Sequence, residues 1–298
     1  MANKNKIKTS PGRKAFVCIN TILLTCVMVL ALFPILNILA LSFSSNSAAA
    51  AGWVTIFPVD FTLDSYKYIL EKPAFFTAFG VSVVRVILGS AISLTVNLLA
   101  AYAMSQSEIH FHARKVYRWI FLITMIFNGG MIPTFMVIKM VGIYNSIWAL
   151  VLPGAVMTFN IILMQNFFKS LPYSLTESGQ LDGANHFQIL WKIVLPISKP
   201  SLATVGLFTI VGHWNSWFDG MIYLSDPNKY PLQTYLRNII QSVDASKLDL
   251  TTVDAMNKVS QRTVTAAQIF IAIIPIMLIY PFLQRYFITG MTLGSVKE

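Results

Sequence analysis

Six long and nearly uninterrupted apolar stretches dominate this sequence. They lie at residues 15–43, 76–104, 117–139, 143–168, 199–224 and 263–288. A helix needs about 20 mostly apolar residues to cross a hydrocarbon core of about 30 Å, and each stretch meets that length. Strands of a membrane barrel alternate and last only about ten residues, so these continuous runs exclude a barrel. Charged residues make up 11% of the chain, less than half of the roughly 25% typical of soluble domains. The sequence therefore predicts an all-α, multi-pass membrane protein with six spanning helices.

The basic residues are concentrated on one side of the predicted spans. Thirteen of the 22 lysines and arginines fall in the amino-terminal tail, the loops after the second and fourth spans, and the carboxyl-terminal end. The opposite loops hold seven, which seven acidic residues balance. The positive-inside rule therefore predicts that both termini are cytoplasmic. The expected organisation is a basic tail at 1–14, a first helix and outer loop at 15–75, a core domain at 76–288 and a tail at 289–298.

The sequence offers little sign of catalytic or cofactor chemistry. Cys18 and Cys26 both lie in the first apolar stretch and are expected to be buried free thiols rather than a disulfide or metal site. The four histidines show no metal-binding spacing, and the phosphate-binding Gly-x-x-x-x-Gly-Lys pattern does not occur. The net charge of +10 follows the membrane topology, and no nucleic-acid-binding motif accompanies it. The chain is therefore not expected to be an enzyme or to bind a cofactor itself.

The predicted cytoplasmic loop at 171–196 has a helix–bend–helix pattern. Ser174 and Glu177 have the spacing of a capping box at a helix start. The pair Asp182-Gly183 is suited to a bend, since glycine tolerates positive φ. A second short amphipathic run follows, and Pro196 is expected to end it. This pattern alone is equally consistent with a simple linker on the membrane surface.

The residues of this loop closely resemble the "EAA" loop of permeases from binding-protein-dependent ATP-binding-cassette importers. The positions in register are Glu177, Leu181, Asp182, Gly183, Ala184, Ile193, Leu195 and Pro196. Ser178 and Gly179 depart from the pattern, because they stand where the family usually has alanines. Both are small, so close approach to a partner is preserved, although a glycine weakens a helix by up to about 1 kcal/mol.

The resemblance extends over nearly the whole chain and implies a function. Ala101-Tyr102-Ala103 resembles the "AYA" segment before the family's first cytoplasmic loop. Overall the chain is most similar to the second permease of maltose-type uptake systems, and the run Asp226–Gln233 resembles an oligosaccharide or uronide branch. The fold implied is the type I importer permease.

The resemblance also implies a set of partners. In that family the loop forms a coupling helix that docks on a cytoplasmic ATPase, so Glu177 and Gly183 are expected to lead this contact. The implied partners are a homologous second permease in a heterodimer, two ATP-binding subunits that hold ATP and Mg²⁺, and an extracytoplasmic solute-binding protein. The implied location is the bacterial cytoplasmic membrane.

Polar residues within the predicted spans are the candidates for a substrate pathway, because such residues are costly in lipid. They are Arg85, Trp214, Asn215, Trp217 and Asp219. Aromatic plates beside amide and carboxylate groups suit a sugar. The alternative is that both tryptophans pack against the partner permease and that Asp219 faces outside water. For Arg85, a structural ion pair is favoured over contact with an anionic sugar.

Two other functional classes remain as alternatives. A secondary transporter driven by an ion gradient should have buried acids in several spans and an inverted repeat, whereas only Asp219 lies within a span. A membrane-embedded enzyme should cluster histidines or acids at one depth. An ATP-driven carbohydrate permease explains the loop at 171–196 better than either of them.

Overall fold

The computed structural model describes residues 10–107, 111–246 and 254–293; the side chains of 242–246, 254–261 and 283–293 are outside this description. Every regular element in the described part is a helix, as the predicted all-α class requires. Three helical stretches are long and apolar enough to cross a membrane by themselves: α1 (Pro11–Ser42), α4 (Pro73–Ser105) and residues Arg262–Phe282 of α15 (Asp254–Leu293). The two predicted tails lie partly outside the described residues, and the domain boundaries stay predictions.

The chain divides into two compact units. The first consists of Met1–Glu71 and Val243–Ile271 and contains α1, α2 (Asn46–Ala50), α3 (Asp64–Leu70) and the first part of α15. Its small core joins the end of α1 to α2 and α15 through Ala40, Leu41, Ala48, Ala49, Val54 and Ala266. The Asn37 side chain donates to the carbonyls of Val54, at 3.3 Å, and Thr55, at 2.7 Å. These bonds hold the segment that follows α2 against the end of α1.

The cysteines of α1 differ from the expectation. Cys18 and Cys26 are free, but both are exposed rather than buried. The apolar window of α1 has none of its residues buried within the described chain. Such a surface is compatible with lipid or with another subunit, so the thiols need no cover from this chain.

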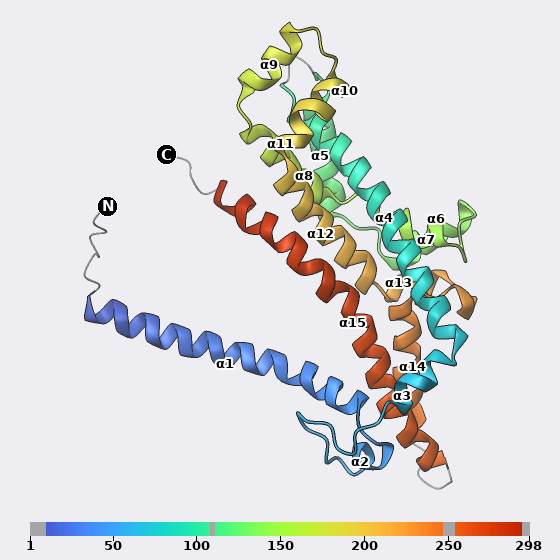
Figure 1. The fold of residues 1–298 in the computed structure, drawn as a ribbon. Helices are drawn as coiled ribbons and strands as arrows, with labels where there is room; N and C mark the ends of the chain where they lie inside the picture. The colour runs from blue at the N-terminus through green and yellow to red at the C-terminus, as the bar shows by residue number, and fades with distance from the viewer. Residues whose placement is uncertain (1–9, 108–110, 247–253, 294–298) are drawn as a thin grey trace. The chain divides into compact units, whose positions relative to one another are not determined.

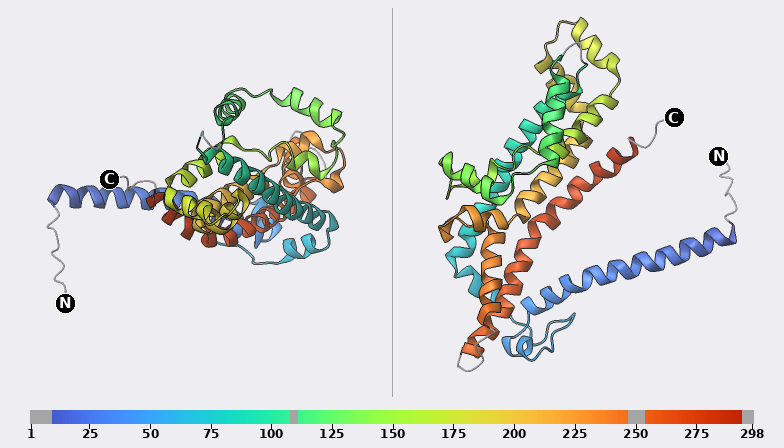
Figure 2. Two further views of the ribbon diagram at one scale, coloured as in Figure 1. Left: turned by 90° about the horizontal axis from the view of Figure 1, so that it is seen from above. Right: turned by 180° about the vertical axis from the view of Figure 1, so that it is seen from behind.

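The second unit consists of Lys72–Ser242 and Ala272–Glu298, and its centre is α4. This helix packs against α8 (Thr158–Ser170) and α12 (Lys199–Asn215), as Figures 1 and 2 show. Its buried face is rich in small residues, which let helices approach closely: Ala78, Ser82, Gly89, Ser90, Ser93 and Ala101. An apolar cluster that includes Leu98, Ile161, Met164, Ile189, Leu190 and Val205 fills the space between these helices.

Three of the six predicted spans are interrupted rather than continuous. The breaks fall between α5 (Arg114–Ile126) and α6 (Met131–Met140), between α7 (Ile147–Val151) and α8, and between α12 and α13 (Phe218–Tyr223). The first pair is bent by 117°, at a turn where Gly130 has φ +84° and donates to Asn128. The second break contains Pro153 and Gly154, which disfavour a helix interior. The count of six spans and the cytoplasmic termini stay predictions.

The remaining elements complete the second unit. They are α9 (Tyr173–Leu181), α10 (His186–Ile189), the π-helix η1 (Leu190–Val194), α11 (Leu195–Ile197), the 3-10 helix η2 (Pro227–Lys229) and α14 (Leu232–Ser246), which runs into the first unit. Figure 1 shows α9 and α10 at one end of this unit, beyond the ends of α4 and α8.

Candidate functional site

The loop at 171–196 has the predicted bend at Asp182-Gly183. Helix α9 ends at Leu181, and Gly183 adopts φ +76°. The amide of Gly183 donates to the carbonyl of Gln180 at 3.0 Å, and that of Ala184 donates to Gly179 at 2.9 Å. These two bonds form a Schellman motif, which satisfies the last carbonyls of a helix. Glycine is the residue that this motif needs, since other side chains resist positive φ.

The predicted capping box at Ser174 and Glu177 is wrong. Helix α9 begins at Tyr173, its N-cap is Pro172, and no side chain caps it. Ser174 therefore already lies in the first turn, where its hydroxyl cannot act as the cap. A capping box does form one bend later, where Asn185 accepts from the amide of Gln188 and Gln188 accepts from that of Asn185, both at 2.9 Å. The same spacing was present in the sequence at 185–188 and was missed.

The expectation that Pro196 ends the second helix of the loop is wrong. The chain widens into the π-turn η1, in which the amide of Leu195 donates to the carbonyl of Leu190. A proline lacks the amide that a regular α-turn requires, and a π-turn is one way to accommodate it. The helix then continues to Ile197, and an 85° bend at Ser198 leads into α12.

Most of the motif residues of the loop are exposed on the surface of this chain. Glu177, Ser178, Leu181, Asp182, Gly183 and Pro196 are exposed, Ala184, Ile193 and Leu195 are half-buried, and Gly179 is buried. Leu181 is 84% exposed, and the nearby Phe187 and Trp191 are 65% and 53% exposed. A methyl group at Gly179 would lie 2.7 Å from Cδ1 of Ile193. Glycine at this departure from the family pattern therefore lets the two helices of the loop touch.

We expect Gly183→Ala to loosen this loop without a steric clash. An added Cβ would meet no atom within 4 Å, so the effect comes only from the left-handed backbone, at about 1–2 kcal/mol. Trypsin cleavage at the exposed Lys192 should then accelerate roughly fivefold to thirtyfold, as the locally open state becomes more populated. Asn tolerates this conformation better than Ala, so Gly183→Asn should cleave at an intermediate rate. Equal rates for the native protein and both variants would contradict the backbone explanation.

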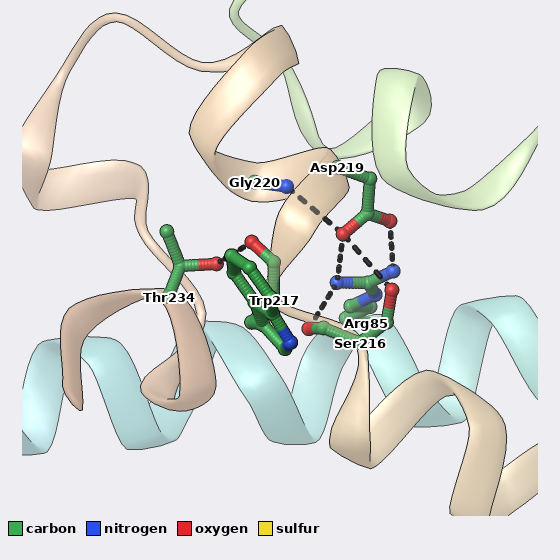
Figure 3. Close-up of polar contacts among 6 residues, drawn as sticks. All are labelled: Arg85, Ser216, Trp217, Asp219, Gly220 and Thr234. Atoms are coloured by element: carbon green, nitrogen blue, oxygen red, sulfur yellow. Dashed lines mark hydrogen bonds and ion pairs between the residues drawn. The ribbon is translucent and has the colours of Figure 1, made fainter. Parts of the chain in front are cut away.

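A second cluster of polar residues lies at the break between α12 and α13. Arg85 of α4 is only 2% exposed and forms a two-pronged ion pair with Asp219 of α13, as Figure 3 shows. Nη1 of Arg85 donates to Oδ1 of Asp219 at 3.1 Å and also to the carbonyl of Ser216 at 3.1 Å. Nη2 donates to the other carboxylate oxygen. The partner that the sequence could not name for Arg85 is therefore Asp219.

This ion pair also satisfies the backbone that the helix break leaves free. The Ser216 carbonyl lies between the two helices and accepts from Arg85. Oδ1 of Asp219 additionally accepts from the Ser216 hydroxyl at 3.0 Å and from the Gly220 amide at 2.9 Å. Nearby, Thr234 donates to the Trp217 carbonyl at 2.8 Å. Unsatisfied backbone groups are costly in a membrane, so these contacts make the break tolerable.

Helix α4 supports the break between α7 and α8 in the same way. The buried Asn97 accepts from the Met157 amide at 3.1 Å and donates to the Ala155 carbonyl at 3.4 Å. A cavity of about 320 Å³ lies between the two breaks; among its lining residues are Arg85, Pro153, Met157, His213, Asp219 and Tyr223. Asn97 was not singled out from the sequence, although an asparagine inside an apolar span is a recognisable signal.

The other predicted pathway residues lie in different environments. Trp214 is 5% exposed, donates through its indole nitrogen to the Ala272 carbonyl at 3.0 Å and meets Phe79 edge-to-face at 5.7 Å. Its packing is thus accounted for within this chain. Trp217 is half-buried, and the Arg237 guanidinium lies 5.0 Å from its ring centroid. Asn215 is exposed. Of the five predicted residues, only Arg85 and Asp219 are brought into direct contact.

Comparison with known proteins places these features in a family context. Residues 98–293 match the family described as binding-protein-dependent transport system inner membrane components. Protein LplC of Bacillus subtilis is 39% identical over 291 residues, covering 97% of each chain. The polygalacturonan/rhamnogalacturonan transport system permease YtcP of the same organism is 38% identical over 264 residues, covering 89% of this chain and 92% of that protein. A solved chain from a bacterial ABC transporter that imports the acidic polysaccharide alginate superposes with a TM-score of 0.84 at 34% identity, covering 95% of this chain and all of that one.

Proposed function

Because this chain belongs to the binding-protein-dependent transport system inner membrane components, we propose that it is one permease subunit of an ATP-driven importer for an acidic oligosaccharide. The observation that carries the proposal is the exposed helix–bend–helix at 171–196, which lies inside the matched region 98–293. A permease makes and breaks no covalent bond, so this subunit is proposed to supply a pathway and a coupling element rather than catalysis.

The substrate class rests on two relatives that are similar over most of this chain. One is named for polygalacturonan and rhamnogalacturonan transport, and the other belongs to an importer of the acidic polysaccharide alginate. Both names refer to polysaccharides that contain sugar acids. At 38% and 34% identity these relatives support a carboxylate-bearing oligosaccharide as the cargo.

The loop surface supports docking on a separate ATPase. Three large hydrophobic residues are exposed on this one short loop: Leu181, Phe187 and Trp191. Clustered hydrophobic groups on a water-exposed surface mark interaction sites. Glu177 and Asp182 add carboxylates that can pair with basic residues of the partner. The Schellman bend fixes the angle between the two helices, so a push on α9 is transmitted to η1 and on to α12.

The proposed mechanism is alternating access. ATP and Mg²⁺ are held by two ATP-binding subunits, whose closure pulls the coupling loops of this chain and a homologous permease together. The connected elements α10, η1 and α11 lead directly into α12, whose far end carries the break stabilised by Arg85. An extracytoplasmic solute-binding protein delivers the sugar to the outer face. Six spans with both termini in the cytoplasm, in the bacterial inner membrane, complete the proposal.

The polar cluster is proposed to shape the pathway. Arg85 and Asp219 neutralise each other beside the cavity, so they act as its scaffold. Trp214 supports the same wall by packing against α4 and α15. Asn215 and Trp217, which retain accessible surface, are the members of the predicted set that can face the passing sugar.

Reconstitution of the complete importer in liposomes tests this function. Uptake of labelled tri-galacturonate should require the binding protein and internal ATP, and orthovanadate should abolish it. Collapse of ion gradients by ionophores should leave uptake unchanged. Uptake that survives vanadate but stops with an ionophore would favour the alternative of an ion-coupled secondary transporter.

A further inference from the structure

One lysine, Lys139, lies against aromatic rings where α6 ends, and a second, Lys229, contacts the backbone beside them. Nζ of Lys139 lies 4.8 Å from the ring centroid of Phe135 and 5.2 Å from that of Tyr144. The Phe135 ring is also stacked with that of Tyr223, at 6.5 Å. We call these four residues and Lys229 the cationic–aromatic cluster. Rings hold an ammonium group in place without neutralising it, so its charge stays available to a ligand.

The backbone around Asn145 holds Lys229 next to the aromatic residues of this cluster. Nζ of Lys229 donates to the carbonyl of Asn145 at 3.0 Å. Asn145 directly follows Tyr144 in the chain. Asn145 adopts φ +57°, and its amide donates to the Tyr223 carbonyl at 2.9 Å. Its side-chain oxygen accepts from the amides of Ser225 and Asp226 at 3.1 and 3.3 Å. A non-glycine residue at positive φ is uncommon, so this junction is built for a particular geometry.

The cluster is continuous with the cavity between the helix breaks. Tyr223 lines that cavity, while its ring stacks on Phe135 and its carbonyl accepts from Asn145. Phe135, Tyr144 and Tyr223 are all half-buried, so each keeps an accessible part of its ring. A ligand in contact with the cluster would therefore be next to the cavity mouth.

The charges near the cluster leave it positive. Lys139 and Lys229 are both exposed, and among the described residues neither forms an ion pair with a carboxylate. Two acids lie on the elements that meet there. Asp219 is neutralised by Arg85, and one oxygen of Asp226 accepts from the Asn228 amide at 2.9 Å. The two ammonium groups thus outnumber the one unneutralised carboxylate.

We infer that the cationic–aromatic cluster is a binding subsite for a sugar ring that carries a carboxylate. The apolar CH face of the ring stacks on Tyr144 or Tyr223, and the carboxylate binds the ammonium groups of Lys139 and Lys229. This assignment rests on the proposed function, including its proposed topology, in which the end of α6 faces outward. It adds the residues of this subunit that select for an acidic cargo.

Charge-neutralising variants in the reconstituted importer test the subsite. The set is Lys139→Gln, Lys229→Gln, the double variant, and the corresponding arginine variants. Each neutralisation should raise the KM for tri-galacturonate uptake roughly tenfold, and the arginine variants should retain most of the affinity. Added salt should raise the native KM more than that of the double variant. Lys67→Gln is the matched control, because it removes an exposed lysine from the other unit, and its KM should match the native value.

Basal ATPase activity and the elution volume of the complex report whether each variant is folded. An unchanged KM in a folded double variant would overturn the subsite while leaving the proposed function intact. Equal loss in the glutamine and arginine variants would also overturn it, because a structural role does not distinguish charge from shape in this way. Native uptake of the neutral probe maltotriose but not of tri-galacturonate would overturn the subsite and the acidic cargo, while leaving the proposed ATP-driven sugar import intact. No uptake of either sugar would overturn both the subsite and the proposed function.

Discussion

Arg85→Met should destabilise the folded permease by about 3–5 kcal/mol, because it leaves the Asp219 carboxylate partly buried without its counter-ion. The variant also removes the donor to the Ser216 carbonyl at the break between α12 and α13. The guanidinium is 2% exposed and the carboxylate 22%, so solvent screens this pair little. The thermal midpoint of the detergent-purified permease pair, followed by the loss of soluble complex on heating, measures the effect.

Two further variants separate the charge from the other contacts of the pair. The combination of Arg85→Met with Asp219→Asn removes both charges and keeps an acceptor for the Gly220 amide, so it should recover part of the lost stability. Lys67→Met is the matched control, since it breaks the ion pair between Lys67 and Asp64. The side chain of Lys67 is 72% exposed and that of Asp64 is 77% exposed. Such a surface pair contributes at most about 1 kcal/mol. Equal shifts for Arg85→Met and Lys67→Met would show that the buried pair has no special role.

The helix–bend–helix pattern of the loop at 171–196 was predictable from sequence, whereas its capping box and the end of its second helix were not. The bend at Asp182-Gly183 was expected because glycine is the residue that favours positive φ, and the structure has φ +76° there. The capping box was placed at the wrong position because two segments of the loop have compatible spacing. Pro172 ahead of α9 left no room for Ser174 to act as a cap, and Asn185 formed the box instead. Spacing alone does not distinguish such alternatives.

The partner of Arg85 could not be predicted, because Asp219 lies 134 residues away in the chain. Hydropathy predicted continuous helices, since a window average does not register a short break whose backbone is satisfied by another helix. Arg85 and Asn97 provide that satisfaction from α4. Polar residues within the apolar helix α4 were therefore a sign that neighbouring helices are interrupted. Only the folded structure shows which interruption each polar residue contacts.

Glu177→Lys should reduce sugar uptake about 30-fold or more and abolish the stimulation of ATPase activity by the loaded binding protein, if this carboxylate pairs with the ATPase as proposed. Glu177 is exposed, and helix α9 is not capped by any side chain. The competing explanation for an acid at this position, a capping role worth about 1 kcal/mol, is therefore removed. The thermal midpoint of the isolated permease pair should stay unchanged, which separates loss of docking from loss of folding.

A graded series makes this prediction sharp. Glu177→Gln keeps the shape and loses the charge, so its uptake should lie between that of the native protein and that of Glu177→Lys. Glu71→Lys reverses an exposed acid at the end of α3, in the other unit, and should leave ATPase stimulation unchanged. Uptake and stimulation at native levels in Glu177→Lys would overturn the coupling role of this residue. A fall in uptake with normal stimulation would place the defect in the pathway rather than in docking, because the ATPase would still sense the loaded binding protein through the loop.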